Sequence, residues 1–213
     1  MQYFVPLFPN YLQVDTRHLS DELNGRLVEI GREYFDNHRK PGSWYSQQRD
    51  NVFVLYPNEL ALRRLASEAT DMARRFISDG WGVDYARDFH IEGQVFVANR
   101  DNGGVAGVAS HVHNRSHLTC TYWPKVAIDA DAPRGQRGEF RLFDPCSHGT
   151  PPWGGTPGWY DVPVETGTMI MFQSSTPHGS AMFVGEERIC FVVDMKVEHN
   201  DNYWVKAREV GND

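Results

Sequence analysis

The order of the sequence patterns limits the fold more than any other feature, because two amphipathic helices come first and strand-like segments follow. Ser20 is a typical N-cap residue, and apolar residues follow it at helical spacing to about residue 37. A second helical pattern begins at Asn58 and ends near Gly80. The strand-like segments, separated by residues rich in Gly, Pro and Asp, are 91–99, 118–126, 139–143, 168–173 and 188–198. This order predicts a mainly β structure of the α+β class, with helices packed on one side of a sheet.

Three other stretches complete the expected arrangement. Residues 1–16 are predicted to be extended, with turns at Pro6 and Pro9. The apolar run Val52–Leu55 predicts a short strand between the two helices. Residues 145–159 contain several glycines and four prolines and predict a long loop, either an active-site lid or a mobile surface loop.

Length and composition limit the class of protein. The 213 residues suit a single domain, 1–213, with a helical part at about 17–80 and a β part at about 90–198. The formal net charge is -7 and no long basic run occurs, so neither nucleic acid nor a membrane is an expected partner. No CxxC pair and no membrane-spanning stretch occur, which favours a cytoplasmic protein and leaves a homodimer open.

His111 and His113 form the first motif with chemical meaning. Side chains alternate along a strand, so two histidines in an HxH pair point to the same side of it. Taken alone the pair is a weak signal, because most histidines in proteins bind no metal. A third histidine from a later strand would give three protein ligands and open positions, the arrangement of a catalytic metal site.

His178 and Arg188 are the candidates for the rest of this site. His178 follows the buried segment 168–173, and Arg188 begins the segment 188–198. If these two strands form an antiparallel pair, both residues reach one end of a cavity. A buried arginine facing an empty pocket is costly, so an anionic cosubstrate is its natural partner. The alternative is a structural ion pair with Glu186 or Glu187.

These residues lie in four motifs whose order resembles one protein family. The motifs read HVHNRSHLTCTYW at 111–123, GEFRLFDP at 138–145, FQSSTPHG at 172–179 and RICF at 188–191. They are similar to HxHxxSxLSGxYY, GxLxFxDP, FPSxxPHG and RxSxSFN in a bacterial and phage branch of the 2-oxoglutarate/iron(II) oxygenases. The resemblance covers about residues 3–197 and implies a double-stranded β-helix of the jelly-roll type, with the N-terminal helices packed on one sheet.

The resemblance also implies a role for each residue. His111, His113 and His178 would bind Fe(II), and Arg188 would bind the far carboxylate of 2-oxoglutarate. Tyr122 is expected to support that carboxylate from an adjacent strand. Together with O2, such a site oxidises, usually by hydroxylation, a small-molecule or amino-acid-type substrate and releases succinate and CO2.

Two residues depart from the better-known pattern of this superfamily. His113 stands where an HxD motif has aspartate. This departure leaves three interpretations open. Three histidines bind iron, a nearby carboxylate such as Asp144 completes or supports the site, or the metal is not iron. Cys190 replaces the serine of the RxS pattern, and because a thiol is a weak donor, another hydroxyl is needed at the carboxylate.

Two rival functions follow from the same residues. A cupin-like dioxygenase with three histidines would not use 2-oxoglutarate, so Arg188 would have no role and no succinate would form. A non-enzymatic jelly-roll binding module would bind no iron tightly and would consume no O2. The sequence does not determine the substrate.

Overall fold

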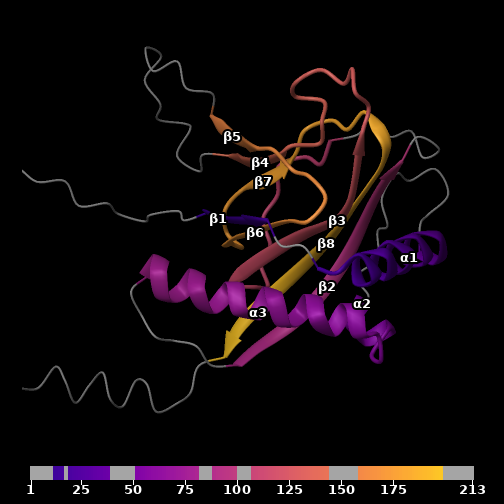
Figure 1. The fold of residues 1–213 in the computed structure, drawn as a ribbon. Helices are drawn as coiled ribbons and strands as arrows, with labels where there is room; N and C mark the ends of the chain where they lie inside the picture. The colour runs from indigo at the N-terminus through magenta and orange to yellow at the C-terminus, as the bar shows by residue number, and fades with distance from the viewer. Residues whose placement is uncertain are drawn as a thin grey trace, which may run out of the picture.

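The computed structural model describes residues 12–16, 19–38, 51–81, 88–99, 107–143 and 158–198 (Figure 1). None of the helices in these ranges is both long enough and apolar enough to cross a membrane. In chain order the elements are β1 (Leu12–Thr16), α1 (Asp21–His38), α2 (Val52–Leu55), α3 (Leu60–Trp81), β2 (Asp88–Asn99), β3 (Leu118–Ile128), β4 (Phe140–Phe143), β5 (Trp159–Val162), β6 (Thr168–Gln173), β7 (His178–Ser180) and β8 (Gly185–Glu198).

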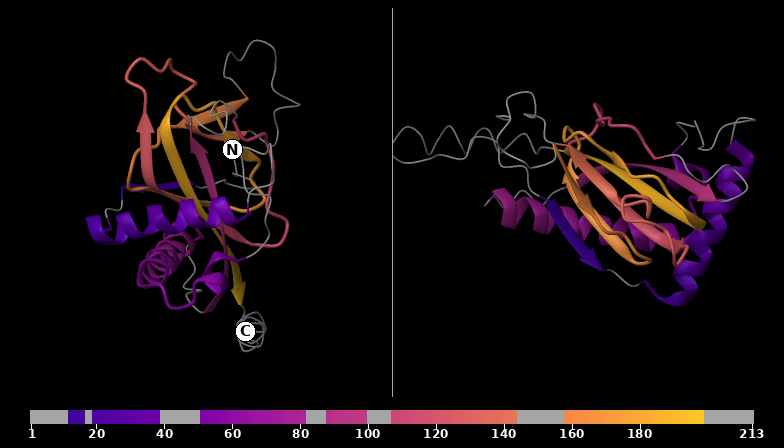
Figure 2. Two further views of the ribbon diagram at one scale, coloured as in Figure 1. Left: turned by 90° about the vertical axis from the view of Figure 1, so that its right-hand side faces the viewer. Right: turned by 90° about the horizontal axis from the view of Figure 1, so that it is seen from above.

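The strands form two antiparallel sheets. The larger sheet has the order β1-β6-β3-β8-β2, and the smaller sheet has the order β5-β4-β7. Figure 1 shows β4, β5 and β7 on the opposite side of the larger sheet from the helices, and Figure 2 shows the same arrangement from two further directions. The mainly β, jelly-roll architecture with helices against one sheet is therefore confirmed.

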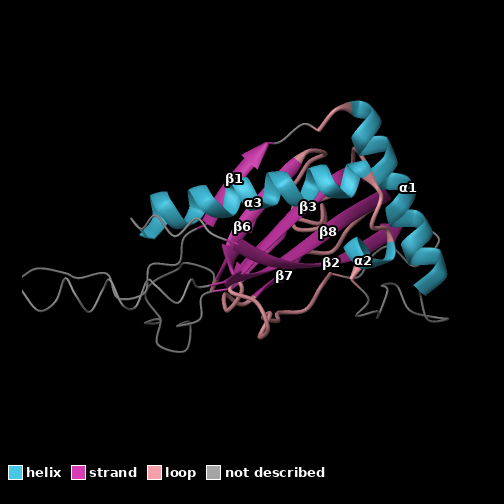
Figure 3. Cartoon of the chain, turned by 90° about the horizontal axis from the view of Figure 1, so that it is seen from below, coloured by secondary structure: helices cyan, strands magenta, loops and turns pink. Residues whose placement is uncertain are grey.

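Helices α1 and α3 cover the outer face of the five-stranded sheet (Figure 3). Leu27 and Ile30 of α1 and Leu65 of α3 are fully buried in this layer, where they join Tyr122 of β3 and Phe191 of β8. Burial of each large apolar side chain contributes about 1.5–3 kcal/mol to folding. The other face of the larger sheet is turned to the smaller sheet.

Strand β3 shows how the alternation of side chains separates the two layers. Cys120 and Tyr122 point toward the helices, while Trp123 joins the apolar cluster between the two sheets. That second cluster also contains Phe140 of β4 and Phe172 of β6. Because side chains alternate along β3, only every second residue can reach the space between the sheets.

Both long helices agree with the sequence prediction, with small differences at their ends. The Ser20 hydroxyl accepts from the Leu23 backbone N–H at 3.4 Å, and the Ser20 carbonyl accepts from Asn24 N–H at 2.9 Å. Helix α3 begins at Leu60 rather than Asn58 and continues through Gly80, which was predicted to end it.

The prediction of a strand at Val52–Leu55 is wrong, because these residues form the short helix α2. Asn51 explains the difference. Its side-chain oxygen caps the helix by accepting from Phe53 N–H at 3.1 Å, and it also accepts from Gly93 N–H on β2 at 2.9 Å. A capping residue with two backbone partners thus outweighs the strand preference of the apolar run.

The predicted pairing of segments 168–173 and 188–198 is also wrong. Strand β3 lies between β6 and β8 and pairs with both of them. The sequence prediction also missed β5 and β7, and described β1 only as extended chain. These strands have three to five residues, too few to show a clear period. The predicted loop at 145–159 falls outside the described residues, apart from its end.

Candidate metal centre

Three histidines from two separate parts of the chain meet at one edge of the jelly roll. Each offers a ring nitrogen, and these atoms lie within 4.8 Å of one another in the group His111, His113 and His178. The centroids of their rings are 4.4–5.2 Å apart. This spacing suits three imidazoles that bind one metal ion.

Backbone pairing brings the HxH motif to the third histidine. His111 N–H donates to His178 O at 2.9 Å, and His178 N–H donates to His111 O at 3.0 Å. Gly179 permits this close approach, because a Cβ at that position would lie 2.3 Å from the carbonyl oxygen of Val108. The predicted strand at the motif is reduced to one isolated bridge, yet both of its histidines still reach the site.

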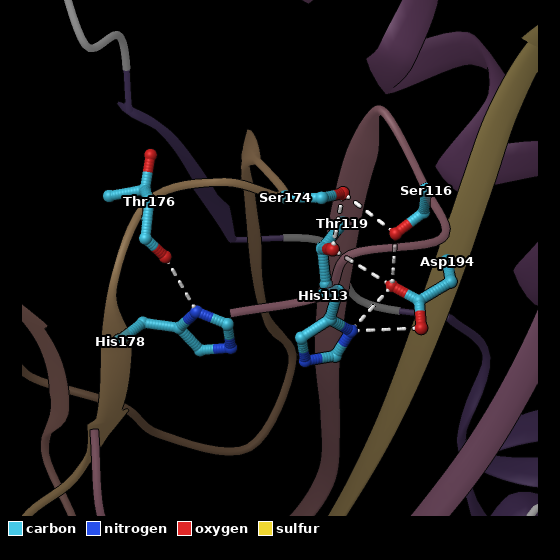
Figure 4. A network of polar contacts seen from close by, with 7 residues as sticks. All are labelled: His113, Ser116, Thr119, Ser174, Thr176, His178 and Asp194. Atoms are coloured by element: carbon cyan, nitrogen blue, oxygen red, sulfur yellow. Dashed lines mark hydrogen bonds and ion pairs between the residues drawn. The ribbon is translucent and has the colours of Figure 1, made fainter. Parts of the chain in front are cut away.

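The other ring nitrogen of each histidine faces an oxygen acceptor. Nδ1 of His111 lies 2.9 Å from Ala109 O, and Nδ1 of His178 lies 2.9 Å from Thr176 O. Nδ1 of His113 lies 2.7 and 2.8 Å from the two carboxylate oxygens of Asp194 (Figure 4). Because such oxygens only accept, Nδ1 must carry the hydrogen, and the Nε2 lone pair of each ring is left to bind a metal.

Partial or full removal from water favours the neutral form of two of these rings. It lowers the pKa of His178 to about 4, although a hydrogen bond to Thr176 O opposes the change. Partial desolvation of the His111 ring lowers its pKa too, against a hydrogen bond to Ala109 O, although this residue is the most exposed of the three. Neutral imidazole is the form that binds metals, so at pH 7 these two ligands need not lose a proton first.

A cavity begins at the three histidines and extends between the two sheets. Its walls are mainly apolar and include Phe96, Val108, Phe140 and Val192. Its polar lining includes Thr121 and Trp123 of β3 and Arg188 and Cys190 of β8. The cavity therefore joins a metal-binding end to a cationic group.

Arg188 has no anionic partner among the described residues. It is 8% exposed, burial lowers its pKa, and its Nε has no hydrogen-bond partner. The predicted alternative partner Glu187 is bound instead by Arg32, at 2.9 and 2.6 Å. Glu139 accepts hydrogen bonds from the backbone N–H groups of Gly135 and Arg137. The guanidinium carbon lies 5.4 Å from the centroid of the Trp123 ring.

Two neighbouring groups in the same cavity also lack partners. The hydroxyl of Thr121 and the indole nitrogen of Trp123 are buried and make no hydrogen bond. Buried polar atoms are normally paired, so three such groups lining one cavity suit a ligand that accepts hydrogen bonds. A carboxylate is a group that can accept hydrogen bonds from such donors and compensate the charge of Arg188. The cavity thus fits a small acid whose other end reaches the histidines.

The predicted role of Tyr122 is wrong. Its hydroxyl donates to the Asn24 side-chain oxygen at 2.6 Å, in the layer between the larger sheet and α1. Burial there raises its pKa to about 12. Tyr122 faces away from the cavity, whereas the hydroxyl-bearing side chain of its neighbour Thr121 lines it.

Cys190 lines the cavity, as its place in the motif suggests. Burial raises the pKa of its thiol to about 12, so it is neutral at pH 7. Asp144, the carboxylate that the sequence suggested for the metal site, lies outside the described residues. The structure instead brings Asp194 to His113, and Asp194 was not among the predicted site residues.

Structural comparison finds the same fold in known enzymes. A prolyl-4-hydroxylase from Pseudomonas putida is similar, with a TM-score of 0.57 and 14% identity over 88% of this chain and 93% of that one. The viral collagen prolyl hydroxylase vCPH from Paramecium bursaria Chlorella virus-1 has a TM-score of 0.55 and 12% identity over 89% and 97%. The epimerase SnoN from nogalamycin biosynthesis has a TM-score of 0.59 and 14% identity over 87% and 77%.

The chain has the fold of the 2-oxoglutarate/iron(II) oxygenases. At 12–14% identity the likeness concerns the fold. No model of a protein family matches the sequence, and a search among curated proteins finds no match. What the chain does must therefore be argued from its own cavity.

Proposed function

We propose that the protein is an iron(II)- and 2-oxoglutarate-dependent oxygenase that oxidises, usually by hydroxylation, a small-molecule or amino-acid-type substrate. The observation that carries the proposal is the unpaired, buried Arg188 in the same cavity as the three histidines. One end of that cavity suits a divalent metal, and the other suits a carboxylate. A short keto acid with a second carboxylate meets both needs. Two structures of this fold, vCPH and EvdO2, are described as complexes with 2-oxoglutarate.

Each side chain has a defined task in this proposal. His111, His113 and His178 hold Fe(II) through Nε2, and Arg188 holds the far carboxylate of 2-oxoglutarate by a charge-assisted contact. The bound metal, 2-oxoglutarate and O2 supply the oxidation of a substrate C–H bond, with release of succinate and CO2. The apolar walls exclude water from the reacting end of the cavity.

Thr121 and Tyr122 allow a paired test, because they are neighbours that face opposite sides of β3. Thr121→Val removes a hydroxyl in the cavity and is expected to weaken 2-oxoglutarate binding about 10- to 150-fold, since a hydrogen bond to a charged group is worth about 1.5–3 kcal/mol. Tyr122→Phe removes the bond to Asn24 and is expected to lower the free energy of unfolding by about 1 kcal/mol, with cosubstrate affinity unchanged. Calorimetric titration and denaturant unfolding measure the two effects, and the opposite pattern would restore the original role of Tyr122.

Succinate formation tests the reaction itself. Protein loaded with Fe(II) without oxygen is mixed with 2-oxoglutarate and then with O2, and succinate is measured before any substrate is known. We expect slow formation that disappears in His111→Ala and in Arg188→Met but persists in His117→Ala. His117 is an exposed histidine near the motif whose Nδ1 accepts from Val197 N–H at 3.0 Å.

The rival functions predict different outcomes of this experiment. Iron binding without succinate formation, and without any effect of 2-oxoglutarate on the iron spectrum, favours a three-histidine dioxygenase that does not use 2-oxoglutarate. Failure to bind iron at all favours a binding module. The buried charge of Arg188 argues against the first rival, because that reaction leaves the guanidinium without a partner.

A further inference from the structure

The three histidines differ in what holds their Nδ1 atoms. His111 and His178 each contact a backbone carbonyl, whereas His113 contacts a carboxylate, that of Asp194. Both carboxylate oxygens lie within 2.8 Å of the ring nitrogen. His113 also occupies the position at which an HxD motif places an anionic ligand. His113, which stands where an HxD motif has its aspartate ligand, is thus the one histidine of the three that contacts a carboxylate.

The carboxylate of Asp194 is not neutralised by any lysine or arginine of the described residues. The side chain is 18% exposed, and no lysine or arginine of the described residues lies within ion-pair distance of it. Its other partners are the neutral hydroxyls of Ser116, at 3.1 Å, and Thr119, at 2.8 Å. Ser174 links these two hydroxyls at 2.9 and 2.8 Å (Figure 4). Three hydroxyl side chains therefore fix the carboxylate against His113 without neutralising it.

A carboxylate in this position alters the ligand that it touches. When an imidazole donates Nδ1–H to a carboxylate, its tautomer and orientation are fixed and its Nε2 becomes a more basic ligand. Part of the negative charge reaches the metal through the ring. Three neutral imidazoles alone would leave the full charge of a divalent ion uncompensated by protein.

We propose that Asp194 is a positioning residue that supplies the negative charge of the metal centre through His113. This inference rests on the proposed function, because it requires that His111, His113 and His178 bind a divalent metal. In this proposal the carboxylate of the site comes from Asp194 on β8, 81 residues after His113, and not from the HxH motif itself. His113 then acts as a connector between metal and carboxylate.

Asp194→Asn tests the charge with little change of shape, because an amide oxygen can still accept from His113. Co²⁺ titration of the metal-free protein, followed by the visible absorption of bound Co²⁺, measures affinity and ligand field without turnover. We expect the affinity to fall about 10- to 100-fold and the spectrum to shift, while the melting temperature of the metal-free protein stays the same or rises. Asp161→Asn is the matched control, since Asp161 pairs with Arg141 outside the cavity and should leave Co²⁺ affinity unchanged.

A second variant shows whether Asp194 acts through His113. In a His113→Ala background the Asp194→Asn change should have almost no further effect on Co²⁺ affinity, because the connection is already broken. Equal affinities and spectra for wild type and Asp194→Asn would overturn the inference, as would a full additional loss in the His113→Ala background. A loss of affinity that only accompanies a lower melting temperature of the metal-free protein would also overturn it. Wild-type protein that binds no Co²⁺, Fe²⁺ or Zn²⁺ would instead overturn the proposed function itself.

Discussion

Replacement of Arg188 by methionine is expected to stabilise the ligand-free protein and to destroy its affinity for 2-oxoglutarate. The guanidinium is 8% exposed and has no anionic partner in the described residues, so its removal relieves an uncompensated buried charge. We expect the free energy of unfolding to rise by about 1–3 kcal/mol. For a chain of this size that is a rise in melting temperature of roughly 2–12 °C.

The effect on binding has the opposite sign. Loss of one partner of a buried ionic contact typically costs 2 kcal/mol or more, so affinity for 2-oxoglutarate should fall by at least about 30-fold. Thermal unfolding with and without 2-oxoglutarate, in protein loaded with Zn²⁺ to prevent turnover, measures both effects. Arg141→Met is the matched control, because Arg141 is paired with Asp161 at 2.7 and 2.9 Å. That variant should lose stability and keep its affinity, and an Arg188→Met protein that behaved in the same way would indicate a structural arginine.

His111→Ala is expected to abolish tight binding of a single divalent metal ion. His111 is the most exposed of the three histidines, so its truncation removes a ligand with little loss of packing. Loss of one of three protein ligands should weaken Co²⁺ or Fe²⁺ binding by more than about 100-fold. Calorimetric titration measures the affinity, and near-ultraviolet circular dichroism confirms that the fold is intact.

His117→Ala supplies the comparison for this experiment. Both histidines are exposed and lie six residues apart, but His117 is not part of the converging group. Its replacement should leave metal affinity unchanged. A similar loss in both variants would mean that the metal is held by scattered surface histidines and not by the proposed centre.

The residues that converge in space could be predicted only where their motifs were distinctive. His111, His113, His178 and Arg188 were expected from their motifs to lie together, and all four line one cavity, although the assumed pairing of strands was wrong. Strand β3 lies between β6 and β8, and its Thr121 and Trp123 line the same cavity as those four residues.

The error at Tyr122 has a simple geometric cause. Successive side chains on a strand face opposite sides, so an assignment displaced by one residue moves the side chain to the other face of the sheet. Thr121 carried the hydroxyl on the correct face. Knowing that Trp123 faces the space between the two sheets would have identified Thr121, and not Tyr122, as the residue on that side. The apolar pattern alone does not show which way Trp123 points.

Asp194 was missed for a different reason. Its partner His113 lies 81 residues earlier, and no local spacing connects the two. A signal was nevertheless present, because a single acidic residue interrupts the apolar run Phe191–Met195, whose four other residues are buried. An acid in such a place requires a partner.

Strand β8 carries Arg188, Cys190, Val192 and Asp194 on one face, and this face has a consequence for the choice of keto acid. The strand pairs along its length with both β2 and β3, so its residues keep a fixed separation. On the proposed function, the anchor for the far carboxylate and the support of His113 belong to one inextensible segment. If the proposed function holds, a keto diacid one carbon shorter or longer than 2-oxoglutarate should bind more weakly, because it would not reach both Arg188 and the three histidines.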